Sequence, residues 1–157
     1  MTRRCWLLSA AALPLRADAA QEAWDALAAA ASALGLGNAS VFLAAFDQAI
    51  PGFADLRANV DGLLSAWNVQ SSIDLVESSG TEEKPALELD WLLQLAMRSD
   101  AARAVRSRQR VKCRFGKQGR RWKIVEFTPL GMFAPPAAAR ANGRSLRGPE
   151  HTPHPGF

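Results

Sequence analysis

Apolar side chains in the first half of the chain recur at the spacing of amphipathic helices. The first such run covers residues 21–34, and two glycines that favour a helix end follow it. A second, shorter run spans residues 40–49, with Ser40 placed to cap it and Pro51 placed to end it. A third run, residues 53–67, carries the longest apolar stripe. The pattern therefore predicts three helices in succession.

Beyond the third helix the apolar positions alternate with polar ones, which is the pattern of a β-strand. The clearest strand covers residues 86–98, where the alternation is strict. Shorter alternating runs lie at residues 69–77, 108–115 and 120–127. The last two are separated by residues 116–119, which have the composition of a hairpin connection. The chain is therefore predicted to be an α+β protein with three N-terminal helices packed on a four-stranded antiparallel sheet.

The two ends of the chain differ from this body in composition. Residues 1–19 have a basic start, an apolar run and then the small-residue triplet Ala17–Ala19, which is the arrangement of a cleavable export signal. We expect cleavage near Ala19 and a periplasmic or secreted protein, with a Sec signal and a twin-arginine signal both left open. Residues 134–157 are rich in Pro, Gly and Ala and predict a disordered tail. The folded domain is thus expected over residues 20–133, without a transmembrane segment.

Positive charge is concentrated in residues 106–123, which hold nine of the nineteen Lys and Arg side chains. Residues 20–133 nevertheless contain thirteen basic and thirteen acidic side chains. On the predicted sheet the basic side chains lie on the face that also carries Glu88 and Asp90, so cross-strand ion pairs are expected. That face has only Phe127 as a base-stacking aromatic. We therefore predict a solvated, salt-bridged sheet face and no nucleic-acid binding, with docking of a partner or a membrane surface as the alternative.

Three stretches, FLAAFDQAIPGFADLRANVDGLL, LELDWLLQL and RRWKIVEFTPLGMF, resemble the nuclear-transport-factor-two-like superfamily. This superfamily is the cystatin-like α+β cone that also includes ketosteroid isomerase, scytalone dehydratase and SnoaL-like proteins. The resemblance covers roughly residues 22–134 and implies that the sheet curves around the helices to enclose a conical pocket. Most of the inward side chains are expected to form the core, and a subset to contact a small apolar ligand. The candidates for this pocket are Trp24, Phe46, Leu63, Trp67, Leu89, Trp91, Leu93, Trp122 and Ile124.

The catalytic groups of the superfamily's enzymes do not carry over to this chain. It has no Tyr, and its only histidines, His151 and His154, lie in the predicted tail, where we expect no metal site. We assign no catalytic residue and keep Glu126 as the one candidate, because alternation places it on the inner face after Ile124. The alternative is that Glu126 lies at the strand end beside solvent or a loop arginine. Cys113 is expected to be a small buried side chain.

The sequence thus predicts an exported, non-enzymatic module that binds a small ligand or mediates protein interaction. A homodimer through the open face of the sheet is one form of that interaction, and no cofactor is expected. The alternative is a small isomerase-like or hydrolase-like enzyme that uses a pocket carboxylate. An enzyme needs a deep pocket with converging polar groups, whereas an interaction module tolerates a cone filled with side chains.

Overall fold

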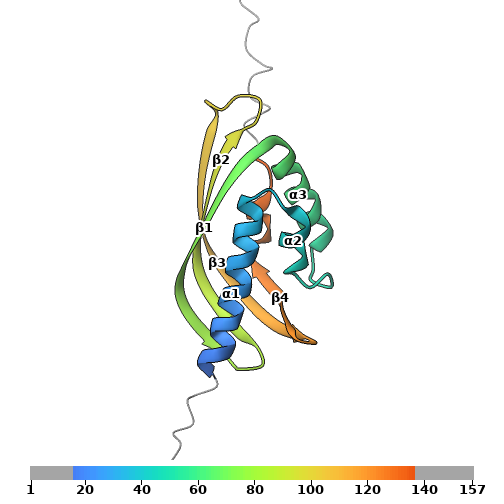
Figure 1. The fold of residues 1–157 in the computed structure, drawn as a ribbon, viewed down its shortest axis with the longest axis vertical. Coiled ribbons are helices and arrows are strands. Elements are labelled where there is room, and N and C mark those ends of the chain that lie inside the picture. The colour runs from blue at the N-terminus through green and yellow to red at the C-terminus, as the bar shows by residue number, and fades with distance from the viewer. Residues whose placement is uncertain (1–15, 137–157) are drawn as a thin grey trace, which may run out of the picture.

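The computed structural model describes residues 16–136 (Figure 1). Most of the predicted export signal and most of the predicted tail lie outside these residues, so both remain predictions. Within the described range, no helix combines the length and the apolar character needed to cross a bilayer.

Three α-helices precede the sheet, and a short helical segment follows it. Their bounds are α1 Arg16–Gly35, α2 Ala39–Ala44, α3 Phe53–Ala66 and the 3-10 helix η1 Leu130–Phe133. The cap of α2 is Asn38, whose side chain accepts the Val41 backbone N–H, and not Ser40 as predicted. Helical structure is therefore not confined to the N-terminal part, because η1 comes after the last strand and packs against α3.

The four strands form one antiparallel sheet in the order β1-β2-β3-β4. Their bounds are β1 Trp67–Gly80, β2 Pro85–Met97, β3 Ala104–Gln118 and β4 Arg121–Thr128. The β3–β4 hairpin is tighter than the predicted connection at residues 116–119, since Gln118 pairs directly with Arg121. Gly119 takes a positive φ of 63° in this turn, a conformation that glycine adopts without strain.

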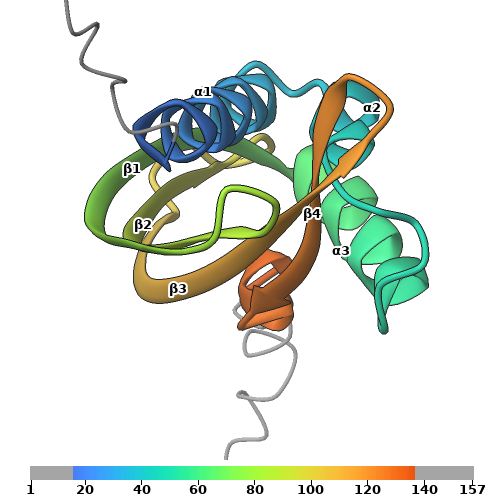
Figure 2. The same ribbon diagram turned by 90° about the horizontal axis from the view of Figure 1, so that it is seen from below.

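The sheet is strongly curved, and the helices pack inside its curve (Figure 2). Helix α1 lies along β1, while α2 and α3 lie at the β4 side. We call the face toward the helices the inner face and the opposite face the outer face. Alternation on β2 is as predicted: inner-face side chains from Leu87 to Leu95 are buried, and outer-face side chains from Ala86 to Ala96 are half-buried or exposed.

Candidate functional site

The interior of the cone is filled by aromatic rings. Five buried side chains supply them: Phe42, Phe46, Trp91, Phe127 and Phe133. The centroids of neighbouring rings lie 5.0–6.4 Å apart, mostly in tilted or edge-to-face orientation, which is the favourable geometry for such pairs. The rings come from α2 and the segment that follows it, and from β2, β4 and η1, so they join the helical layer to the sheet. The chain's own side chains therefore fill this part of the cone.

Most of the nine side chains predicted to line a pocket belong to the hydrophobic core of the domain, of which the aromatic cluster is one part. Seven are buried: Phe46, Leu63, Trp67, Leu89, Trp91, Leu93 and Ile124. The other two, Trp24 and Trp122, are half-buried and pack against the core. Trp122 also borders a surface hollow of about 530 Å³ at the N-terminal end of α1, where its indole N–H donates to Glu22 Oε2 at 2.6 Å.

The side chains that the structure places in the interior are almost entirely apolar. Among the side chains that the structure describes, no polar or charged residue is buried. Trp91 donates its indole N–H to Ser71 Oγ at 2.9 Å, which satisfies the only polar atom of the largest interior ring. Cys113 is buried as predicted, and burial raises the pKa of its thiol to about 12. The thiol therefore stays protonated at neutral pH and is not an activated nucleophile.

Glu126 is on the outer face, so the prediction that placed it inside the cone is wrong. A β-bulge at Val125 is the reason, because Ile124 pairs with Phe115 while Glu126 pairs with Arg114. One extra residue reverses the alternation beyond it. The Glu126 side chain is 64% exposed and its carboxylate lies 3.6 Å from the Arg114 guanidinium.

The same bulge turns Phe127 inward, although alternation had placed it beside the basic side chains. Phe127 is 8% exposed and joins the aromatic cluster. The outer face accordingly has no base-stacking aromatic from this strand.

The outer face carries opposite charges on different strands. On β3 every outward side chain from residue 106 to residue 114 is basic: Arg106, Arg108, Arg110, Lys112 and Arg114. On β2, Asp90 accepts hydrogen bonds from Arg110 at 2.6 Å and from Arg108 at 2.9 Å, and Glu88 pairs with Arg110 at 3.1 Å. These cross-strand ion pairs confirm the predicted role of Glu88 and Asp90. The hydrogen bonds from Arg110 and then Arg108 lower the pKa of Asp90 below its ordinary value.

On β1 the outward charges are acidic and lie beside further acids. Asp74 is the cross-strand neighbour of Asp90, and Glu77 is the neighbour of Glu88. Like charges in direct cross-strand positions are unfavourable. Within residues 16–136 neither Asp74 nor Glu77 has an ion-pair partner. Arg108, Arg110 and Lys112 of β3 therefore pair with the acids of β2, whereas the acids of β1 have no counter-charge among the described residues.

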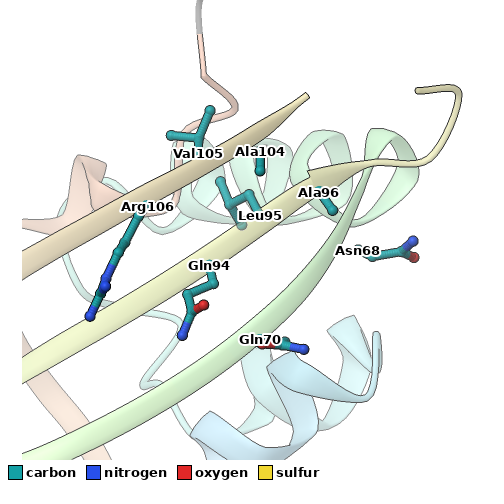
Figure 3. A pocket seen from close by; sticks show the side chains of 8 residues that line it. All are labelled: Asn68, Gln70, Gln94, Leu95, Ala96, Ala104, Val105 and Arg106. Carbon is teal, nitrogen blue, oxygen red and sulfur yellow. The ribbon is translucent and has the colours of Figure 1, made fainter. Parts of the chain in front are cut away.

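A hollow of about 290 Å³ lies at the other end of the outer face, and Figure 3 shows its side chains. The register places Ala96 opposite Ala104, and these two small side chains leave the space. Arg106 and Gln94 project from neighbouring strands to the same side of the sheet (Figure 3). The remaining contacts come from Asn68, Gln70, Leu95 and Val105. No acidic side chain lines the hollow as the structure describes it.

The fold and the site together define a helix-packed, strongly curved antiparallel sheet with a filled interior. No family model and no curated protein matches the sequence. Solved structures do match it, and the chain has the nuclear transport factor 2-like fold. The prediction made from three short stretches of sequence is thereby confirmed at the level of the fold.

Three of these solved structures illustrate the likeness. A conserved protein from Planctomyces limnophilus aligns with a TM-score of 0.62 and 10% identity, over 68% of this chain and 91% of its own. A nuclear transport factor 2-like superfamily protein from Salmonella enterica aligns with a TM-score of 0.58 and 12% identity, over 82% and 99%. A ketosteroid isomerase-like protein from Erwinia carotovora atroseptica aligns with a TM-score of 0.58 and 8% identity, over 69% and 92%. At such identities the likeness concerns the fold alone.

Proposed function

We propose that this chain is an exported, non-enzymatic interaction module that pairs with a second copy of itself through the outer face of its sheet. The observation that carries the proposal is the charge pattern of that face. Acids without counter-charge lie on β1, and a continuous basic row lies on β3 two strands away. Such a face is complementary to its own copy. The export signal-like sequence of residues 1–19 supports the location.

A two-fold axis that lies in the plane of the interface and runs along β2 gives this pairing. Rotation about such an axis brings β1 of one copy onto β3 of the other at the same level along the strands. Asp74 then faces Arg110 of the second copy, and Glu77 faces its Lys112, because each pair shares one cross-strand row. Each contact occurs twice, as an isologous interface requires. The strands of the two sheets run nearly aligned, which is a common way for sheets to pack face to face.

The interior supports an interaction module over the enzyme alternative. An isomerase-like or hydrolase-like mechanism needs a base and a hydrogen-bond donor that converge on a substrate. The one candidate carboxylate, Glu126, lies on the outer face and faces Arg114. The five-ring cluster fills the part of the cone that lies between α2, β2, β4 and η1. Of the functions open to this fold, surface recognition is the one that this geometry supports best.

Charge reversal tests the pairing. Lys112→Glu places an acid against Glu77 of the second copy at both symmetry-related contacts and should weaken the dimer by about tenfold or more. The double variant Glu77→Lys/Lys112→Glu restores opposite charges in swapped positions and should recover dimerisation. Lys84→Glu is the matched control, because Lys84 lies in the β1–β2 turn away from the outer face. Light scattering after size exclusion, over a range of protein concentrations, measures the dimer fraction.

Two results would overturn the proposal. One is a wild-type chain that stays monomeric up to millimolar concentration. The other is a dimer that Lys112→Glu leaves intact, or that the double variant fails to restore, since the contact between β1 and β3 would then not hold it. A folded monomer is recognised in each variant by its native far-ultraviolet circular dichroism.

A further inference from the structure

Arg106 differs from the other basic side chains of its row. Arg108, Arg110, Lys112 and Arg114 each lie within 4.0 Å of a carboxylate oxygen. In the part of the chain that the structure describes, Arg106 has no such partner, and its cross-strand neighbour on β2 is the uncharged Gln94. Its guanidinium therefore keeps all of its donors for another group.

The surroundings of Arg106 add both hydrogen-bonding groups and apolar contact. Gln70, Gln94 and Arg106 follow one another across β1, β2 and β3 in a single cross-strand row. The amide groups supply donors beside the guanidinium. Ala96 and Ala104, in the next row, form an apolar floor that is low enough to leave about 290 Å³ of space.

This combination selects one kind of ligand. A planar guanidinium with free donors matches the two oxygens of a carboxylate and forms paired, charge-assisted hydrogen bonds with it. A single cation balances a single negative charge, and the alanine floor suits a compact apolar body. The absence of acidic side chains from the described lining leaves no internal competitor for the arginine.

We propose that the Arg106 hollow is a binding site for the carboxylate of a small organic acid. The guanidinium of Arg106 holds the carboxylate, the amides of Gln70 and Gln94 donate to its remaining lone pairs, and the carbon body lies over Ala96 and Ala104. The site is complete within one chain, so it does not rest on the proposed pairing. In the paired form the two hollows lie at the same end of the interface and face each other, and a bound acid lies between the two copies.

Sodium benzoate is the probe, followed in ¹H–¹⁵N spectra of the labelled chain, with benzamide as the neutral compound of the same shape. We expect saturable shifts of the Arg106 Nε–H and Gln94 side-chain amide signals with benzoate and none with benzamide. Arg106→Gln should weaken benzoate binding about tenfold or more. Ala96→Leu should remove binding while Arg106 remains, because it fills the hollow. Arg108→Gln is the matched control, since it removes the next cation of the same row and should leave the affinity nearly unchanged.

The inference is overturned by an absence of saturable shifts. It is also overturned by equal losses in the Arg106→Gln and Arg108→Gln variants, which would indicate general attraction of anions, or by benzamide binding as well as benzoate. Native signal dispersion in each spectrum shows that the variants are folded.

Titration of both the wild-type chain and the Lys112→Glu variant separates this site from the pairing. Arg106-dependent binding in the Lys112→Glu variant supports the site even where the chain does not pair. A dimer that binds no benzoate overturns the site and leaves the proposed function standing.

Discussion

The hydrogen bond between Trp91 and Ser71 gives a sharp test of how the cone is filled. Trp91 is fully buried among the other aromatic rings, and its indole N–H has Ser71 Oγ as its partner at 2.9 Å. Ser71→Ala removes the acceptor and leaves a buried N–H without a partner. A buried N–H without a partner lowers the free energy of unfolding by about 1–3 kcal/mol. A loss of about 2 kcal/mol lowers the melting temperature of a domain of this size by roughly 8 °C.

Urea unfolding followed by fluorescence measures this free energy, provided that the slope of the transition stays the same in wild type and variant. The matched control is Ser72→Ala, because Ser72 is the next residue of the same strand and its side chain is exposed on the outer face. Trp91→Phe closes a double-mutant cycle: once the indole N–H is absent, Ser71→Ala should cost almost nothing. Two results would refute the reasoning: a loss of less than about 0.5 kcal/mol in the free energy of unfolding for Ser71→Ala, or losses in the two single variants that add up in the double variant. Either would mean that water can reach the indole N–H and replace Ser71 as its partner.

Two further predictions concern ionisation. The pKa of Asp90 is lowered in the fold, first by the hydrogen bond from Arg110 and then by that from Arg108. The stabilisation by its carboxylate is therefore complete above the ordinary pKa of 3.8 and is lost as the pH falls through the folded-state value. Asp90→Asn should lower the urea midpoint at neutral pH, and the difference from wild type should vanish in strong acid; a difference that persists there would contradict this origin. The buried thiol of Cys113, with its pKa raised to about 12, should react with a disulfide reagent only as fast as the fold opens. In a chain with Cys5→Ser, the rate should rise with urea, and immediate reaction at mildly alkaline pH would show that the thiol is accessible.

Most of the elements could be predicted from the sequence because their patterns are local. The strand around Trp91 alternates without interruption, and the structure places it at residues 85–97 against a prediction of residues 86–98. The third helix begins at Phe53 as predicted, since an apolar stripe and a preceding glycine both mark that position. The cross-strand ion pairs of Asp90 followed from the same alternation once the strands were placed in order.

The location of the candidate site could not be predicted, because it depends on single residues that interrupt the alternation. The bulge at Val125 exchanges the faces of Glu126 and Phe127, and nothing in the run of side chains marks where an extra residue is left unpaired. The filling of the cone also depends on Phe133, which reaches the cluster from a 3-10 turn that follows the sheet. Its apolar character was visible, whereas its position beside Trp91 arises only from the tertiary fold. The hollow at Arg106 is equally a product of register.

The filled cone also restricts the paths by which this chain can acquire new chemistry. An interior reaction chamber has to be made by shortening rings such as Phe133, and each buried Phe→Ala change costs about 3–5 kcal/mol. That is a large fraction of the roughly 5–15 kcal/mol by which a domain is stable, so an intermediate with an emptied cone is close to unfolding before it gains any activity. Substitutions on the outer face carry no such cost. New binding functions in this chain are thus expected to arise on the outer face of the sheet, by single substitutions that leave the core intact.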